Sequence, residues 1–412
     1  MKMIKKTIPV LIVAMVFLAE AGAQMTSSPY SIFGAGLVAD NGFGVTKGMG
    51  GTGIAFKSTN SLNNVNPASY SGIDSLSFLF EVGLFGSYTR SFQKNVIQHQ
   101  FNGNLRYIAL GCRITKWWAS SLGIVPLSSV GYRITSTGNI EGELTPYTTT
   151  FTGDGGLNQF YLSNAFNPIK NLSLGLNTSY IFGAITRNES MSSNGSFKGY
   201  LISKTNHIHN LYFDFGGQYT LNKGKWGYTL GLVYGRKRNL QSTSDYFLAY
   251  SNDTIELTGK ESEYMIPAKY GIGLGVAKGR KFRAGFDYER HDWSASKFTN
   301  PMLSVRNSER FSVGIDYTPY ENYRDRWYKK LFYRLGANYE KSYLVLDHVP
   351  VNSMAVSFGV GIPLKNDYSM INISLEAGKN GTSDNGMIKE NFYMLHVNFS
   401  LHDIWFLKPK YD

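Results

Sequence analysis

The chain has 412 residues and a formal net charge of +12; 15% of its residues are aromatic and only 17% are charged. The basic residues are scattered through expected turns and loop ends instead of clustering on one module, which argues against a nucleic-acid-binding protein. Cys112 is the only cysteine, so an intramolecular disulfide is excluded.

A secretory signal is predicted at residues 1–23. A lysine-rich start, a short apolar run and the small residues Ala21-Gly22-Ala23 follow the order of such signals. The apolar run is too short to span a bilayer as a retained helix. An exported chain that is rich in Tyr and Gly and poor in charge favours a transmembrane β-barrel in the outer membrane of a Gram-negative cell. A secreted β-sandwich or a propeller shares part of this composition and is the alternative fold.

Residues 24–74 are predicted to form a hatch, an irregular plug inside the barrel. Pro29, Pro67 and many glycines prevent regular ladders here, and irregular backbone at membrane depth is tolerated only where protein surrounds it. The centre of the hatch is a GMGG run followed by NPA. We expect structural roles for these residues, in tight turns and with an Asn side chain that caps them. They are Gly48, Met49, Gly50, Gly51, Asn66, Pro67 and Ala68.

Residues 75–412 are predicted to form an all-β transmembrane barrel of about fourteen antiparallel strands, because apolar and polar residues alternate with a period of two between turns. In the last strand Leu395 and Val397 share a face that suits lipid, and His396 and Asn398 share a face that suits a polar lumen. An even strand number lets a single chain close without an unpaired edge in lipid. The predicted strands cover residues 75–89, 99–115, 119–135, 157–166, 171–183, 206–221, 226–237, 263–278, 281–290, 309–318, 330–342, 352–363, 368–379 and 391–401.

The turns predict the orientation of this barrel. Short polar turns at residues 222–225, 278–280 and 365–367 are expected on the periplasmic side. Four longer connections are expected outside the cell, at residues 188–205, 239–262, 294–308 and 380–390.

Several blocks of the chain resemble the FadL-type outer-membrane channels for hydrophobic compounds, in particular members from Bacteroidota. These blocks are residues 48–51 and 66–68 of the hatch, residues 153–160 and 171–177, and residues 267–275 with the following Phe286-Asp287-Tyr288 and Trp293. The resemblance implies a fourteen-stranded barrel with an N-terminal hatch. It also implies passive uptake of hydrophobic molecules, such as long-chain fatty acids or similar lipophiles, through movement of the hatch.

Pro126 lies in the third predicted strand, although proline cannot donate to a ladder and belongs at an edge or a bulge. In one interpretation it marks the end of the strand. In the other it kinks the strand and opens a gap in the wall, and FadL-type channels have such a kink as a lateral exit for the ligand. The candidate residues of the ligand path are Phe33, Phe43, Phe56, Pro126 and Leu127. The three phenylalanines are equally explained by packing within the hatch.

No enzyme is predicted, because the short nucleophile and zinc motifs are absent. His207 and His209 share a strand face without a fitted carboxylate or cysteine, so neither a metal nor a cofactor is expected. The expected partners are a hydrophobic small molecule, outer-membrane lipid and lipopolysaccharide, but not nucleic acid, and the chain is expected to be a monomer.

The alternative function is a protein-binding platform, a FadL-like barrel related to the type IX secretion shuttle. An apolar tunnel that continues to the kink would favour transport. A wide polar lumen or a large exposed loop surface would favour the platform.

Overall fold

The computed structural model describes residues 28–40, 42–94, 96–139, 146–193, 199–294, 303–320, 326–364 and 369–404. The predicted signal at residues 1–23 lies outside the described residues. Within these ranges the chain is almost entirely β-structure, and none of its helices is long and apolar enough to cross a membrane.

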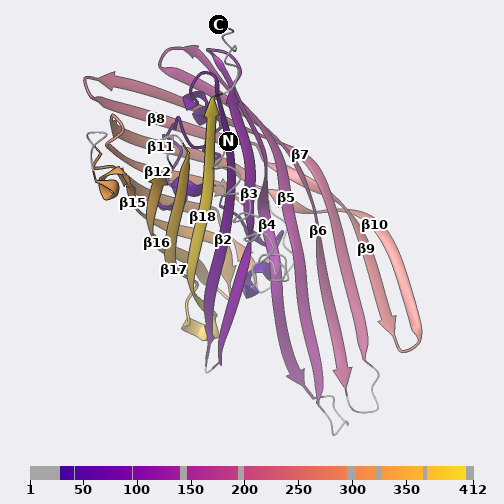
Figure 1. The fold of residues 1–412 in the computed structure, drawn as a ribbon. Helices are drawn as coiled ribbons and strands as arrows, with labels where there is room; N and C mark the ends of the chain where they lie inside the picture. The colour runs from indigo at the N-terminus through magenta and orange to yellow at the C-terminus, as the bar shows by residue number, and fades with distance from the viewer. Residues whose placement is uncertain are drawn as a thin grey trace, which may run out of the picture.

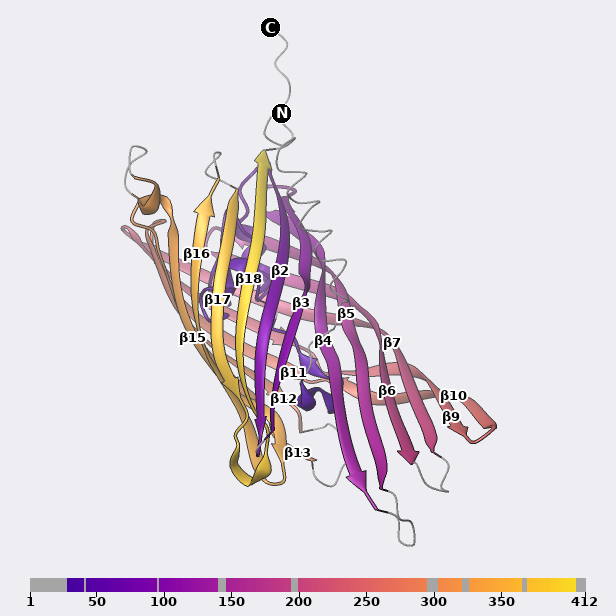
Figure 2. The ribbon, with the colours of Figure 1, turned by 60° about the horizontal axis from the view of Figure 1, so that its bottom comes forward.

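The strands form one closed antiparallel barrel (Figures 1 and 2). Each wall strand pairs with its neighbours, and the last strand returns to pair with the first over residues 389–404 and 77–92. Of the eighteen described segments, β1 belongs to the hatch, and three successive pairs (β8 with β9, β10 with β11, β13 with β14) are halves of interrupted strands. The described wall therefore has fourteen strands, and the predicted fold class is confirmed.

The wall consists of β2 (Ser77–Gln93), β3 (Val96–Arg113), β4 (Trp118–Gly138), β5 (Tyr147–Ile169), β6 (Leu172–Ser193), β7 (Tyr200–Lys223), β8 (Trp226–Gly235), β9 (Arg238–Tyr250), β10 (Asp253–Ile266), β11 (Ala268–Lys278), β12 (Phe282–Asp292), β13 (Leu303–Val305), β14 (Ser308–Tyr317), β15 (Phe332–Leu346), β16 (Val349–Pro363), β17 (Met370–Asn380) and β18 (Lys389–Ile404). Two short 3-10 helices, η3 (Trp327–Lys330) and η4 (Asp384–Gly386), lie between wall strands.

The two faces of the wall differ as the alternation predicts. On β18 the side chain of Leu395 is exposed to the surroundings of the barrel, whereas His396 and Asn398 are buried inside it. Aromatic rings end the apolar belt on its outer side; for example, the ring centroid of Tyr234 lies 5.4 Å from that of Tyr270. Such a belt with aromatic borders is the surface that a bilayer requires.

The end of the barrel that was predicted to be extracellular differs from the prediction in its loops. Residues 188–205 and 239–262, predicted as long loops, are mostly strand: β6 and β7 reach Ser193 and Tyr200, and β9 and β10 form a hairpin. The loop prediction was wrong because the inward face of these strands, which is polar within the aromatic belt, becomes apolar beyond it. On β6, Leu174 faces out and Ser179 faces in within the belt, whereas beyond it Ile185 is the buried residue.

These extensions make one side of the barrel taller than the other (Figures 1 and 2). We call residues 128–138, 147–156, 184–193, 200–208 and 238–266 the outer wall. Its inward face is apolar and partly open: the exposed fraction is 38% for Ile202, 52% for Ile255 and 65% for Leu257. The cross-strand register places Leu257 opposite Tyr246, on the same face as the buried Ser244.

Residues 28–73 form the hatch inside the barrel. This segment contains η1 (Pro29–Ile32), β1 (Leu37–Val38), α2 (Gly44–Lys47) and η2 (Pro67–Gly72). Ile54, Asn66 and Ala68 are fully buried. The hatch contacts strands on all sides of the lumen, from β4 to β7 and from β16 to β18.

Inward-facing glycines let the hatch approach the wall closely. A Cβ atom on Gly175 would overlap the backbone of Pro67 and Ala68, and one on Gly314 would lie 2.5 Å from the carbonyl oxygen of Met49. Several of these glycines are direct cross-strand partners, so they form a continuous row. This glycine belt comprises Gly175, Gly216, Gly231, Gly273, Gly275, Gly285, Gly314, Gly336 and Gly359.

We predict that Gly175→Ala destabilises the protein by about 1–3 kcal/mol, because the added methyl group overlaps hatch backbone. The matched control is Gly217→Ala on the adjacent strand, where the new Cβ would meet only the Leu174 side chain at 3.9 Å. The unfolding midpoint of each variant in detergent checks this prediction. Equal midpoints for the two variants would contradict the close approach of hatch and wall.

Candidate functional site

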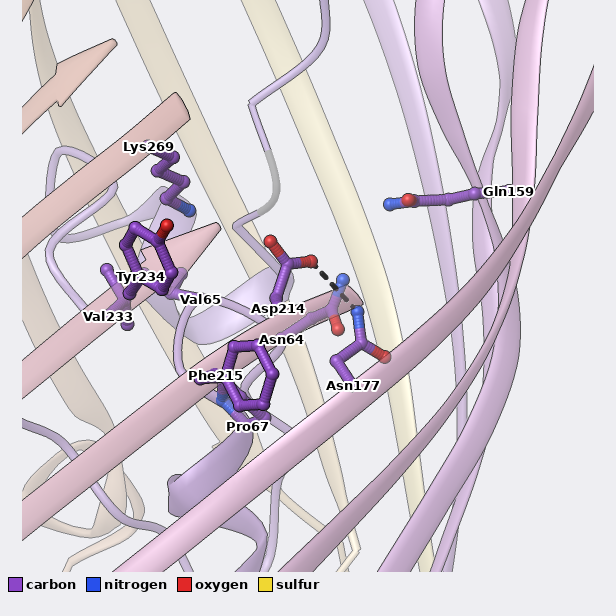
Figure 3. Close-up of a pocket in the computed structure, with 10 residues that line it drawn as sticks. All are labelled: Asn64, Val65, Pro67, Gln159, Asn177, Asp214, Phe215, Val233, Tyr234 and Lys269. Carbon is purple, nitrogen blue, oxygen red and sulfur yellow. Dashed lines mark hydrogen bonds between the residues drawn. The ribbon is translucent and has the colours of Figure 1, made fainter. Parts of the chain in front are cut away.

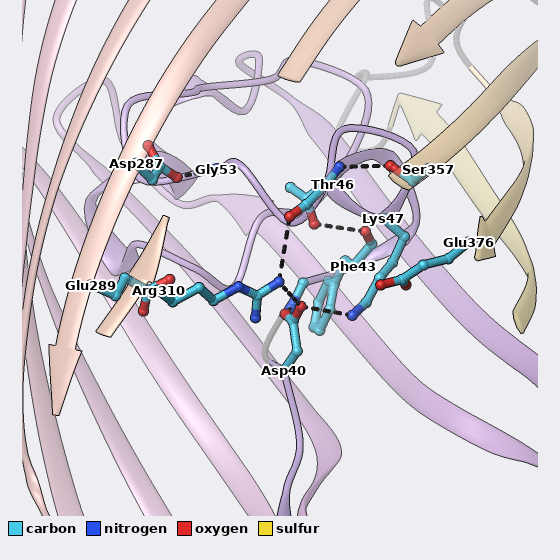
Figure 4. A network of polar contacts seen from close by, with 12 residues as sticks. Asp40, Phe43, Thr46, Lys47, Gly53, Asp287, Glu289, Arg310, Ser357 and Glu376 are labelled. Atoms are coloured by element: carbon cyan, nitrogen blue, oxygen red, sulfur yellow. Dashed lines mark hydrogen bonds and ion pairs between the residues drawn. The ribbon is translucent and has the colours of Figure 1, made fainter. Parts of the chain in front are cut away.

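Polar side chains of the wall hold the backbone of the hatch. The Oδ2 atom of Asp287 accepts hydrogen bonds from the backbone N–H groups of Gly53 and Ile54, at 2.6 and 2.9 Å. The Oγ atom of Ser357 accepts a third from the N–H of Gly50 at 2.9 Å (Figure 4). These N–H groups have no partner in a β-ladder, and a buried N–H without a hydrogen-bond partner costs free energy. The three bonds from the wall remove this cost.

A buried charge network joins the start of the hatch to the opposite wall (Figure 4). The carboxylate of Asp40 lies 2.7 Å from the guanidinium of Arg310 and 3.0 Å from the ammonium of Lys47. Arg106 also donates to the backbone carbonyl of Asp40 at 2.7 Å. Burial acts to raise the pKa of Asp40, but Arg310 and Lys47 hold that pKa well below its usual range. The network therefore stays charged and ties the hatch to β3 and β14.

The predicted turn residues of the hatch lie where its chain reverses. Gly50 and Gly51 have φ angles of +67° and +89°, which L side chains rarely adopt. The Asn66 side chain accepts from the N–H of Ala68 at 3.0 Å, at the start of η2, and donates to the carbonyl oxygen of Ile54 at 2.8 Å. Met49 is buried against the glycine belt.

The three candidate phenylalanines lie in separate places. Phe43 stacks on Tyr107 with ring centroids 3.8 Å apart. Phe56 contacts Gly285 and lies under the guanidinium of Arg283. Phe33 is partly buried in a cluster near the outer rim. The structure therefore does not bring them together in one pocket.

Pro126 lies where β4 separates from β3. These two strands pair only between residues 108–113 and 119–124, whereas β3 continues along β2 to Val96 and β4 continues along β5 to Gly138. The register with β5 also shifts between Pro126 and Ser128, which makes Leu127 a bulge residue. Beyond their last pair, Ile108 with Ile124, the strands β3 and β4 diverge (Figure 2). We call this opening the seam.

The N-terminal part of the hatch, residues 28–39, covers the seam, and we call it the strap. Its β1 pairs with β4 at Ser128 and Ser129, where β3 is no longer paired. The N–H groups of Ser28 and Ala39 donate to the carbonyl oxygens of Gly131 and Leu127, at 2.8 and 2.9 Å. The strap therefore takes the place of a wall strand along part of the free edge of β4.

Close packing of the strap on β4 depends on Gly36. Its φ angle is +90°, and a Cβ atom there would overlap the carbonyl oxygen of Ser129. Sequence reasoning missed the strap because β1 has only two residues, too few for a periodic signal. It also gave no role to Asp287 and Arg310, although a charge on the inward face of a glycine-rich strand is a signal for a hatch contact.

A small cavity lies between the hatch and the wall (Figure 3). Its volume is about 20 Å³, which holds about one water molecule and no hydrocarbon ring. The cavity is lined by Asn64, Val65, Pro67, Gln159, Asn177, Asp214, Phe215, Val233, Tyr234 and Lys269.

His207 and His209 lie on the exposed face of β7. The Nε2 atom of His207 is 3.3 Å from a carboxylate oxygen of Asp245. Within the part of the chain that the structure describes, no three His, Cys, Asp or Glu residues gather as a metal site would require.

The sequence matches the BamG family model over residues 3–412. The chain belongs to the BamG family. No curated protein matches this BamG-family chain. With its apolar belt and closed fourteen-stranded wall, it is an outer-membrane β-barrel of a Gram-negative cell.

Solved structures share the fold of this BamG-family protein. The CymD monoaromatic hydrocarbon channel has a TM-score of 0.60 at 16% identity, over 88% of this chain and 98% of its own. The toluene transporter TbuX of Ralstonia pickettii gives the same values. The toluene transporter TodX of P. putida has a TM-score of 0.60 at 14% identity, over 90% and 100%. The expected FadL-type fold is confirmed, whereas the resemblance to members from Bacteroidota in particular stays a prediction.

We predict that Asp40→Asn destabilises the protein by roughly 2–4 kcal/mol, because Arg310 and Lys47 lose their shared counter-charge while still largely buried. The control is Asp245→Asn, which breaks the half-exposed contact with His207 and should cost about 0–1 kcal/mol. Unfolding midpoints in detergent measure both effects. A midpoint of Asp40→Asn equal to that of the control would show that the network does not hold the hatch.

Proposed function

We propose that this protein takes up hydrophobic molecules passively across the outer membrane and releases them sideways through the seam between β3 and β4. The observation that carries the proposal is that the pairing of β3 with β4 stops before Pro126 and that, among the described residues, the strap pairs with the edge of β4 beyond it. A lateral exit lets an apolar ligand enter the membrane without crossing water.

The outer wall is the proposed collecting surface. Its inward face offers partly exposed apolar side chains, among them Ile202 and Leu257, on the extracellular side of the hatch. Transfer of apolar surface from water to such a face contributes about 25 cal/mol per Å². A ligand held there lies beside the strap, because Ile32 and Ala35 of the strap pack against Val130 and Ile185 of the same wall.

The strap, and not the whole hatch, is the proposed moving part. Residues 44–73 are held by the glycine belt and by bonds to Asp287 and Ser357, so a large shift would leave many buried groups without partners. The strap is held by a two-residue ladder with β4, by bonds of Ser28 and Tyr30 to Glu390 and Ile388, and by a bond from Arg187 to the carbonyl oxygen of Gly34. These partners lie toward the outer end of the wall, so the strap can separate from them without a shift of residues 44–73. Its release would open the seam while the lumen stays blocked to water. In the structure as described the strap is closed.

The proposed ligand class is a lipophile that is mostly hydrocarbon, such as an aromatic hydrocarbon or a long-chain fatty acid. The shared fold with CymD, TbuX and TodX, which are a monoaromatic hydrocarbon channel and two toluene transporters, supports this class. The apolar residues of the outer wall and the strap support it from this chain itself.

A disulfide that locks the strap should stop uptake. Leu37 and Ser129 are direct cross-strand partners, so Leu37→Cys with Ser129→Cys, in a Cys112→Ser background, places two thiols side by side. Uptake of radiolabelled toluene or oleate by whole cells should fall to the level of cells without the protein when the pair is oxidised. It should return on reduction.

The control lock is Thr220→Cys with Thr229→Cys, a cross-strand pair of β7 and β8 next to the turn at residues 222–225, away from the outer wall and the strap. It should form without a change in uptake. Unchanged uptake with an oxidised strap would rule out the seam as the exit.

The outer wall also favours a second candidate function, a platform for a protein partner. Ile255 and Leu257 lie near the turn of the β9–β10 hairpin and are exposed, so a protein partner can also reach them. Ile255→Asp with Leu257→Asp separates the two functions. Loss of a co-purifying protein with normal uptake would favour the platform, whereas reduced uptake would favour ligand collection. Thr254→Asp with Thr258→Asp on the opposite face of β10 is the control.

A further inference from the structure

Three consecutive cations stand at an interruption of the wall between β8 and β9. Arg236, Lys237 and Arg238 are all exposed. Arg236 and Lys237 take part in no ladder, because β8 ends its pairing at Gly235 and the pairing between β9 and β10 begins at Arg238. Pro267, which lacks an N–H, lies between β10 and β11 at the same level. We call these three cations the basic triplet.

The opposite neighbour is interrupted as well. Residues 209–213 of β7 have no partner in β8 or β9, since pairing stops at Asp214 and resumes at Ile208. Here the Asn210 side chain accepts a hydrogen bond from the N–H of Gln241 at 3.3 Å and donates one to its carbonyl oxygen at 3.1 Å. The Asn210 side chain thus replaces the backbone pairing between β7 and β9 at this point. The side chains of the basic triplet are exposed on the outside of the wall.

The depth of the basic triplet follows from the aromatic belt. Tyr234 ends the belt on this strand, with its ring next to those of Phe215 and Tyr270. The triplet follows two to four residues later. At about 3.3 Å per residue and a strand tilt of about 40°, this places it roughly 5–10 Å beyond the apolar core. That distance is the depth of the headgroup layer.

The basic triplet carries more positive charge than the acidic groups near it can balance. Arg290 on β12 lies at the height of Tyr270 but stands opposite Glu309 on β14, so it does not add to this excess. Asp292 is within electrostatic range of both Lys237 and Arg290. Other cations at this level have carboxylate partners, such as Lys341 with Glu309 at 2.9 Å. Among the described residues no ion pair involves the basic triplet.

We propose that the basic triplet binds the phosphate groups of an outer-leaflet glycolipid, the phosphorylated headgroup of lipopolysaccharide. Two guanidinium groups and one ammonium group at headgroup depth match this ligand, because arginine binds phosphate oxygens with two parallel hydrogen bonds. The bound lipid would cover the interruption of the wall above Phe215 and Tyr234. This site is separate from the seam and does not depend on transport.

The test compares Arg236→Gln with Lys237→Gln and Arg238→Gln against a control with the same loss of charge. The control, Lys223→Gln with Lys225→Gln and Arg280→Gln, removes three exposed cations at the periplasmic turns. Binding of fluorescent lipid A to the full chain in detergent is measured for each. The Kd should rise roughly tenfold or more in the triplet variant and stay nearly unchanged in the control. Lipid A without phosphates should bind the wild type as weakly as lipid A binds the triplet variant.

Three outcomes would overturn the proposal. An equal loss of binding in both variants would mean a general charge effect. No loss in the triplet variant would place the lipid elsewhere. Displacement of lipid A from the wild type by millimolar inorganic phosphate would identify the site as one for soluble phosphate. Because the three side chains are exposed, the variant should fold, and Lys237→Gln alone provides a milder second test.

Discussion

A backbone N–H or C=O group that faces lipid without a hydrogen-bond partner costs several kcal/mol, and the architecture of this protein follows from that constraint. The wall closes because β18 returns to β2. Where β4 separates from β3, the strap pairs with part of the exposed edge. Where β7 separates from β9, the Asn210 side chain bonds to the opposite backbone. At both interruptions part of the freed backbone therefore has a local replacement for the ladder.

The two parts of the hatch are held by different forces. Residues 44–73 meet glycines of the wall at close range and donate to buried side chains such as Asp287. The strap is held toward the outer end of the wall, by a short ladder with β4, by the close approach of Gly36 to Ser129, and by bonds to Glu390 and Arg187. A plug held around the lumen next to a strap held at one end of the wall would let the seam open without opening the lumen.

Much of the fold could be predicted because period-2 alternation marks every strand that faces lipid. Each predicted strand overlaps a wall strand, and the face assigned to Leu395 is the exposed one. The outer wall could not be predicted, because beyond the aromatic belt apolar residues such as Ile185 point inward. The outward residues there are polar, which is also typical of a loop. The pairing of β1 with β4 and of Asp40 with Arg310 joins residues far apart in sequence, which no local pattern encodes. Pro126 could be identified from the sequence as a site where a strand is interrupted. The separation of β3 from β4 at that site could not be predicted.

Hydrogen exchange of the full chain in lipid nanodiscs, read by mass spectrometry, tests the central claim most directly. The amides of residues 44–73 should exchange as slowly as those of the wall strands, and those of residues 28–39 should exchange faster. Addition of a hydrophobic ligand such as toluene should accelerate exchange in residues 28–39 and in the facing edge of β4 only. Equal protection of both parts, unchanged by the ligand, would contradict a mobile strap on a fixed hatch.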